Sequence, residues 1–127
     1  MGDRHPETVH RAGHAGGCCA CGGVRFIAHG PLEAVGVCHC LTCRRWSGYV
    51  WGAVRHARDD IEWLADETLS WWRSPARACR GFCQVCGASL FFDADHDAGL
   101  EIRAGAFDGP LGRATARHIF CAEAGAY

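Results

Sequence analysis

Lysine is absent from this chain of 127 residues, so all thirteen of its basic side chains are arginines. Fourteen acidic side chains balance them, and the formal net charge of -1 gives no general attraction to nucleic acid. No apolar run is long enough to cross a bilayer. These absences argue against nucleic acid or a membrane as partner and favour small molecules. Because the guanidinium of arginine pairs well with carboxylates, an acidic ligand is weakly indicated.

The first seventeen residues also lack the apolar run that forms the core of a signal peptide. They are small, polar and rich in histidine, so we expect a flexible tail over residues 1–16, followed by one domain over residues 17–127. Without a secretory signal we expect a cytoplasmic protein, whose cysteines stay reduced. The ten cysteines then indicate metal ligation and argue against a disulfide framework.

Three of these cysteines lie within six residues, Cys38 to Cys43. Side chains two apart on an extended segment share a face, so Cys38 and Cys40 point together while His39 points away. A turn after Leu41 can bring Cys43 to the same face. Three thiolates form a tetrahedral zinc site that keeps one position free for water or substrate. The stretch therefore predicts an open site at which chemistry takes place.

Two further cysteine groups are accompanied by glycine, which lets the backbone turn tightly around a metal. In the first group, the spacing allows either Cys18 or Cys19 to act with Cys21. The second group is Cys83 and Cys86, a C-x-x-C pair followed by Gly87. Two thiolates from each group complete a closed four-cysteine site that joins the first strand to the second half of the chain. A reversible disulfide is the alternative, and it is disfavoured because such pairs normally start a helix in an α/β protein.

Short runs of β-favouring residues recur along the chain between turn signals. We expect a short helical turn at 42–48 and strands at 24–28, 33–37, 49–54, 61–64, 69–73, 89–92 and 100–104. No long segment has a helical period of apolar residues. The pattern predicts a mainly β protein of one domain.

Several of these segments resemble, in the same order, the glutathione-dependent formaldehyde-activating enzyme (GFA) family. They are residues 17–26, 38–48, 80–90, 105–108 and 117–120. The resemblance implies the β-tent fold, a set of coiled β-sheets stapled by zinc, with two zinc ions per chain. The family pattern Gly-Gly-Cys-x-Cys-Gly selects Cys19 and Cys21, with Cys83 and Cys86, as ligands of a structural zinc. Cys18 stands where the family usually has a second glycine.

The resemblance also implies a function for the open site. There Cys38, Cys40 and Cys43 would hold a catalytic-type zinc near the place where glutathione binds. The family reaction joins the thiol of glutathione to formaldehyde, so we expect a zinc-dependent carbon-sulfur lyase or synthase that adds a thiol to an aldehyde. The alternative is a non-enzymatic zinc-binding module that uses the scaffold for protein contacts or metal handling. The open site favours the enzyme, because a structural module would close it with a fourth protein ligand.

Four residues beside the open site are candidates for catalysis or substrate binding. His39 is a candidate for proton transfer, because imidazole exchanges a proton near neutral pH, with a packing role as the alternative. Arg44 is a second catalytic candidate, as a partner of the thiolates. Arg45 and Trp46 are candidates for binding the carboxylates and the body of a substrate such as glutathione. Three cysteines stand outside both predicted sites: Cys18, Cys79 and Cys121.

Overall fold

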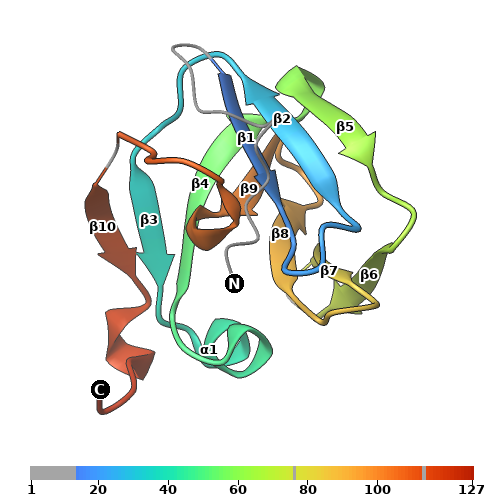
Figure 1. Ribbon diagram of the computed structural model, residues 1–127. Helices are drawn as coiled ribbons and strands as arrows, with labels where there is room; N and C mark the ends of the chain where they lie inside the picture. Colours follow the sequence, from blue (N-terminus) through green and yellow to red (C-terminus); the bar gives the residue numbers. More distant parts are fainter. Residues whose placement is uncertain (1–13, 76, 113) are drawn as a thin grey trace.

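Two β-sheets of unequal size make up the part of the chain that the computed structural model describes, residues 14–75, 77–112 and 114–127. The smaller sheet is antiparallel, with the strand order β1-β2-β5. Its strands are β1 (His14–Cys18), β2 (Arg25–His29) and β5 (Ile61–Ala65). In Figure 1 this sheet lies across one face of the larger sheet.

The larger sheet has seven strands in the order β10-β3-β4-β9-β8-β7-β6. Only the pair of β10 and β3 is parallel among its described strand pairs. The strands are β3 (Val35–Cys38), β4 (Trp51–Ala57), β6 (Leu69–Ser74), β7 (Ala78–Cys83), β8 (Ser89–Ala94), β9 (Gly99–Arg103) and β10 (Thr115–Ile119). The predicted mainly β fold of one domain is confirmed.

One α-helix and three single turns of 3₁₀ helix complete the described structure. The helix α1 (Leu41–Ser47) lies at one end of β3 and β4 in Figure 1, and it corresponds to the predicted helical turn at 42–48. The 3₁₀ turns are Arg58–Asp60, Ala104–Ala106 and Cys121–Glu123. Of the described helices, none has the length and apolar character needed to span a membrane.

The seven predicted strands correspond to β2, β3, β4, β5, β6, β8 and β9, whereas β1, β7 and β10 were not predicted. Glycine and cysteine interrupt β1 and β7, and such residues give a weak strand signal. Most of the predicted tail, residues 1–13, lies outside the described residues. Residues 14–16, which the prediction also placed in the tail, belong to β1, so the ordered sheet begins before the expected boundary.

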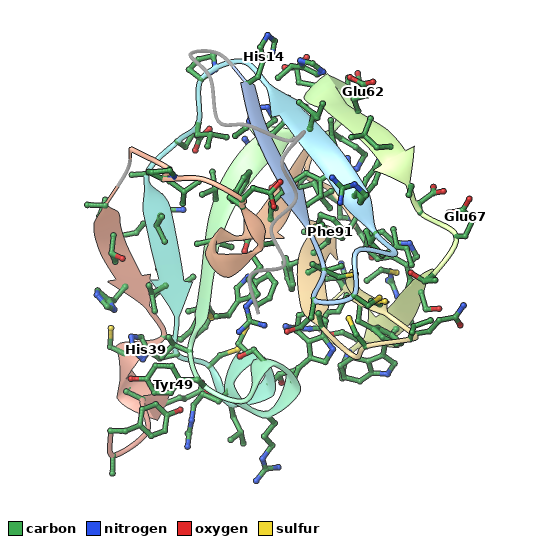
Figure 2. The ribbon with its side chains drawn as sticks, viewed as in Figure 1. His14, His39, Tyr49, Glu62, Glu67 and Phe91 are labelled. Carbon is green, nitrogen blue, oxygen red and sulfur yellow. The ribbon has the colours of Figure 1, made fainter. Side chains whose placement is uncertain are left out.

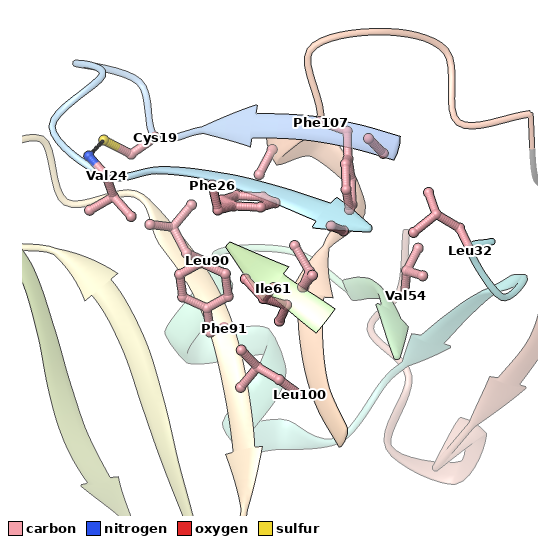
Figure 3. Packing of buried hydrophobic residues seen from close by; sticks show 14 of the residues in the cluster. Cys19, Val24, Phe26, Leu32, Val54, Ile61, Leu90, Phe91, Leu100 and Phe107 are labelled. Atoms are coloured by element: carbon pink, nitrogen blue, oxygen red, sulfur yellow. Dashed lines mark hydrogen bonds between the residues drawn. The ribbon is translucent and has the colours of Figure 1, made fainter. Parts of the chain in front are cut away.

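Phe26 lies at the centre of the core between the two sheets (Figure 3). It is fully buried, because alternation along β2 directs Phe26 and Ala28 to the same face. Its ring makes edge contacts with Phe91 of the larger sheet, at 5.5 Å between centroids, and with Phe107, at 5.6 Å. Burying a side chain of this size contributes about 1.5–3 kcal/mol. The aromatic contacts therefore hold the two sheets face to face.

The close approach of β1 to Phe26 requires glycine at position 17. A Cβ on Gly17 would lie 2.5 Å from Cζ of Phe26 and 2.6 Å from the carbonyl oxygen of Ala106. We expect Gly17→Ala to lower the free energy of unfolding by about 1–3 kcal/mol, as overpacking does in other cores. Gly52→Ala is the matched control, because the nearest atoms to its Cβ are 3.8 Å away. Urea denaturation measures both, and equal midpoints would contradict the prediction.

Candidate metal centres

Four cysteines gather where the turn between β1 and β2 meets the turn between β7 and β8. Their sulfur atoms all lie within 4.8 Å of one another, and we call the group the four-cysteine site: Cys19, Cys21, Cys83 and Cys86. Each turn places a glycine directly after its second cysteine, Gly22 with φ 81° and Gly87 with φ 78°. Only glycine adopts this left-handed conformation without strain, so these positions allow the turns to fold sulfur toward sulfur.

The distances within the four-cysteine site fit a metal centre. Sγ of Cys21 lies 3.7 Å from Sγ of Cys19 and 3.7 Å from Sγ of Cys83. A disulfide bond is much shorter, about 2.05 Å. Four thiolates at about 2.3 Å from a tetrahedral zinc ion are separated by about 3.8 Å, which agrees with these contacts. Donor type, number and spacing therefore all suit one zinc ion.

Hydrogen bonds to sulfur favour the thiolate form of Cys83 and Cys86 at this site, whereas the neighbouring thiols raise the pKa of Cys21. Backbone N–H groups approach the sulfurs of Cys19, from Val24 at 3.3 Å, and of Cys83, from Cys86 at 3.5 Å. Burial acts to raise the pKa of Cys83, but the hydroxyl of Thr68 and backbone N–H groups outweigh it and lower that pKa to about 6. A thiolate is the form that binds metal, so this sulfur is prepared for that role at neutral pH.

Cys18 does not join the four-cysteine site, although the spacing in the sequence had left this open. Its sulfur instead contacts Oδ1 of Asp108, at 3.6 Å. Burial, together with the nearby Asp108 carboxylate, raises the pKa of Cys18 to about 11. Cys18 is therefore a protonated thiol at neutral pH. The structure brings Cys19 to the cluster in its place, because successive side chains of a strand point in opposite directions.

A second group of sulfurs, the three-cysteine site, lies where β3 passes into α1. It consists of Cys38 at the end of β3, Cys40 at the N-cap of α1 and Cys43 in the first turn of α1. The sulfur of Cys40 accepts the backbone N–H of Cys43 at 3.3 Å, as the oxygen of a capping serine does. Among the described residues, no histidine, carboxylate or fourth cysteine completes this group. Its donors match a three-ligand zinc site.

The environment of the three-cysteine site is apolar and largely closed. Cys43 is 3% exposed, and Trp46, Trp51 and Phe92 pack around the sulfurs. Burial raises the pKa of Cys43 and, to a lesser degree, that of Cys38. Burial acts in the same direction on Cys40, but hydrogen bonds from Cys43 outweigh it and lower the pKa of Cys40.

Arg80 of β7 also reaches the three-cysteine site, a contact that the sequence analysis missed. Its guanidinium Nη1 donates to Sγ of Cys43 at 3.5 Å, and the residue is 1% exposed. The segment 80–90 had been interpreted only as a cysteine-glycine turn. The sequence does contain a signal for this contact: if β7 is recognised as a strand, alternation puts Arg80 and Phe82 on one face of the sheet. Phe92, the partner of Arg80 on β8, lies on that face as well.

The four candidates for catalysis or substrate binding occupy different positions around α1. His39 directs Nε2 to Nδ1 of His118 on β10, at 2.8 Å, and the two rings are stacked. Arg45 is exposed on α1. Trp46 is half-buried against the three-cysteine site, with its ring 5.1 Å from that of Trp51. Of these three side chains, Trp46 is the one that packs against the sulfurs.

The fourth candidate, Arg44, is engaged by the end of the chain. Its Nη1 donates to the carbonyl oxygen of Glu123 at 2.8 Å, and its Nε donates to the hydroxyl of Tyr127 at 3.3 Å. The carboxylate of Glu123 also accepts the backbone N–H of Leu41, the first residue of α1, at 2.8 Å. Figure 2 shows Tyr49 and His39 at this end of the molecule, beside α1 and the C-terminal residues. These contacts fix the start of α1 and with it the position of Cys40.

Comparisons with known proteins are consistent with this geometry. The model of a family described as "Glutathione-dependent formaldehyde-activating enzyme" matches residues 14–123, and so covers both cysteine sites. A crystal structure of a Rhodobacter sphaeroides protein is similar in fold, with a TM-score of 0.62 and 21% sequence identity. The similarity covers 81% of this chain and 98% of that one. None of the curated proteins matches the chain.

Proposed function

The chain belongs to the glutathione-dependent formaldehyde-activating enzyme family, and on that premise we propose that it adds the thiol of glutathione to formaldehyde. Its two facing sheets are the β-tent fold that the resemblance implied. In the proposed reaction the thiol sulfur bonds to the carbonyl carbon, and the thiol proton ends on the carbonyl oxygen. The product is S-hydroxymethylglutathione, and no oxidant or reductant is needed. An enzyme of this kind is classed as a carbon-sulfur lyase.

The observation that carries the proposal is the set of three converging sulfurs at the three-cysteine site. Cys38, Cys40 and Cys43 would hold one zinc ion, and the four-cysteine site would hold a second, structural one. When bound at three thiolates, zinc supplies a Lewis acid with a free position, which favours the thiolate form of an incoming thiol. A purely structural module would be expected to provide a fourth protein ligand, and none of the described residues does so.

The chain itself would position the reactants at this site. Trp46 and Trp51 form an apolar wall beside the sulfurs and limit the access of water. The exposed guanidinium of Arg45 on α1 is our candidate for binding a carboxylate of glutathione. Arg44 and His39 are held by Glu123 and His118, contacts that favour a role in fixing α1 and β10 over direct contact with substrate.

A rate measurement tests the proposed function. Loaded with zinc, the protein should form S-hydroxymethylglutathione at least about tenfold faster than glutathione and formaldehyde react alone, a difference of about 1.4 kcal/mol in barrier. Exchange spectroscopy with carbon-13 formaldehyde measures both rates at equilibrium. The Cys79→Ser variant, whose sulfur lies outside both cysteine sites, should keep the acceleration. If protein carrying two zinc ions does not accelerate the reaction, the proposal is wrong.

A further inference from the structure

Arg80 occupies an unusual place for a charged residue. It is 1% exposed, and its guanidinium carbon lies 4.8 Å from the ring centre of Phe92 and 5.3 Å from that of Trp46. Its Nη1 donates to the sulfur of Cys43, at 3.5 Å. Its Nε is buried and has no hydrogen-bond partner among the described residues. The side chain of Arg80 is thus enclosed by two aromatic rings and one side of the three-cysteine site.

No carboxylate in the described part of the chain forms an ion pair with this buried cation. The ion pairs among the described residues join other side chains, those of His29, Arg55, Arg58 and Arg73 with acidic residues. The half-buried carboxylate of Glu101 lies in the same cross-strand row, with Phe92 between it and Arg80, so the charge of Arg80 acts on it only at a distance. This carboxylate accepts the indole N–H of Trp51 at 2.9 Å. An arginine does not lose its proton in a protein, and an unpaired buried charge is strongly unfavourable. The ionisable group that the guanidinium contacts directly is the sulfur of Cys43, so the three sulfurs are the anionic partner within its hydrogen-bond reach.

We infer that Arg80 is the counter-ion of the three-cysteine site, a positioning residue that makes this site able to hold zinc in a buried, apolar environment. The inference rests on the proposed function, because that proposal puts zinc at this site. Three thiolates and one zinc ion carry one net negative charge, which the guanidinium neutralises. The hydrogen bond to Cys43 also fixes the direction of one of the three sulfurs.

The four-cysteine site does not need such a partner. Cys21 and Cys86 are exposed, so water can stabilise the negative charge of that site directly. Loss of the charge at Arg80 is therefore expected to affect one site and to leave the other as an internal reference within the same molecule.

The counter-ion also bears on the ligand that the three-cysteine site accepts. A buried site that is neutral as a whole takes up a further anion at a lower electrostatic cost than a site that is already negative. Arg80 therefore favours a thiolate, or another soft anion, at the remaining position. The substrates that suit this site are therefore small anionic sulfur compounds.

Zinc titration of Arg80→Met tests the inference. Methionine keeps an apolar stem between Trp46 and Phe92 and removes the charge, so the variant is expected to fold. Competition with a chromogenic chelator should show two ions in the unmodified protein. In Arg80→Met one ion should stay tight and the second should bind about 10- to 100-fold more weakly, the usual effect of losing a group that holds a metal ligand. With Co²⁺ as the probe ion, the sulfur-to-metal charge-transfer absorption of Arg80→Met should be weaker than that of the unmodified protein. The difference should be the share that three of the seven thiolates contribute.

Two further variants make the outcome decisive. Arg103→Met is the matched control, because Arg103 lies over the ring of Trp51, at 5.5 Å, and bonds to Ser89 but to no sulfur. It should keep both affinities within about twofold. Arg80→Lys retains the charge and should recover much of the second affinity if charge is the cause. If Arg80→Lys binds the second ion no better than Arg80→Met, or if Arg80→Met binds both ions as tightly as the unmodified protein, the inference is overturned.

Loss of the tight ion in Arg80→Met would indicate that this variant does not fold, and the comparison of Arg80→Lys with the unmodified protein then decides. If Arg80→Lys binds the second zinc ion less than about tenfold more weakly than the unmodified protein, the result supports the role of the charge. A larger loss of affinity overturns the inference. The same titration separates this inference from the proposed function. If the unmodified protein binds only one zinc ion, the proposed function fails together with its site. If it binds two and Arg80→Met binds both with the same affinities, the role of Arg80 alone is refuted.

Discussion

Cys83→Ser should lower the free energy of unfolding by more than about 4 kcal/mol, because it removes a thiolate from the site that joins the two halves of the chain. Cys83 is fully buried at the end of β7, and its sulfur lies 3.7 Å from that of Cys21, 62 positions earlier in the sequence. A metal ion that binds two turns so far apart in the sequence closes a long loop, so it lowers the conformational entropy of the unfolded chain as well as stabilising the folded one. Domains of this kind have about 5–15 kcal/mol of stability, so at the low end of this range the variant would keep only about 1 kcal/mol.

Urea denaturation followed by tryptophan fluorescence measures this effect. Cys79→Ser is the matched control on the same strand, since its sulfur is outside both sites, and it should change the stability by less than about 1 kcal/mol. Removal of metal from the unmodified protein by a strong chelator should reproduce most of the loss. Coincident denaturation curves for Cys83→Ser and Cys79→Ser would show that the four-cysteine site holds no stabilising ion.

Cys43→Ser should have the opposite profile, with activity lost and most of the stability retained. The substitution removes one of three donors at the three-cysteine site, so zinc should bind there at least about 100-fold more weakly. The rate of S-hydroxymethylglutathione formation should fall to that of the uncatalysed reaction. The main core and the four-cysteine site do not include Cys43, so the loss of stability should be smaller than in Cys83→Ser.

The measurement combines metal content with rate. Cys43→Ser, dialysed against dilute zinc, should retain one ion per chain and show no acceleration in the exchange experiment. Cys121→Ser serves as control, because Cys121 is exposed and belongs to neither site. A Cys43→Ser protein that still accelerates the reaction would move the chemistry away from the three-cysteine site.

The three-cysteine site could be predicted because it depends on short-range geometry. Cys38, Cys40 and Cys43 lie within six residues, and a strand end followed by a helix turn is enough to bring their sulfurs together. The choice between Cys18 and Cys19 was different, because both have a suitable spacing to Cys21. The family pattern selected Cys19, and the structure agrees, because the end of β1 turns this side chain toward Cys21.

The contribution of Arg80 could not be predicted in the same way. The missed strand β7 contains glycine and cysteine, and its position between β6 and β8 comes from pairing with residues distant in the sequence. Only this pairing determines on which face of the sheet Arg80 lies. Only the packing of α1 against that face then places Cys43 beside the guanidinium.

The sequence by itself therefore determined the mainly β class and the three-cysteine site, because spacing over a few residues specifies local turns and strand alternation. The family and the ligands of the four-cysteine site followed from the resemblance of whole motifs. The tertiary structure alone decided the neighbours across sheets and turns: Asp108 for Cys18, His118 for His39, Glu123 for the start of α1 and Arg80 for Cys43. The physical reason is that these contacts join segments far apart in the chain. Their position follows from strand register and core packing, which short-range patterns do not encode.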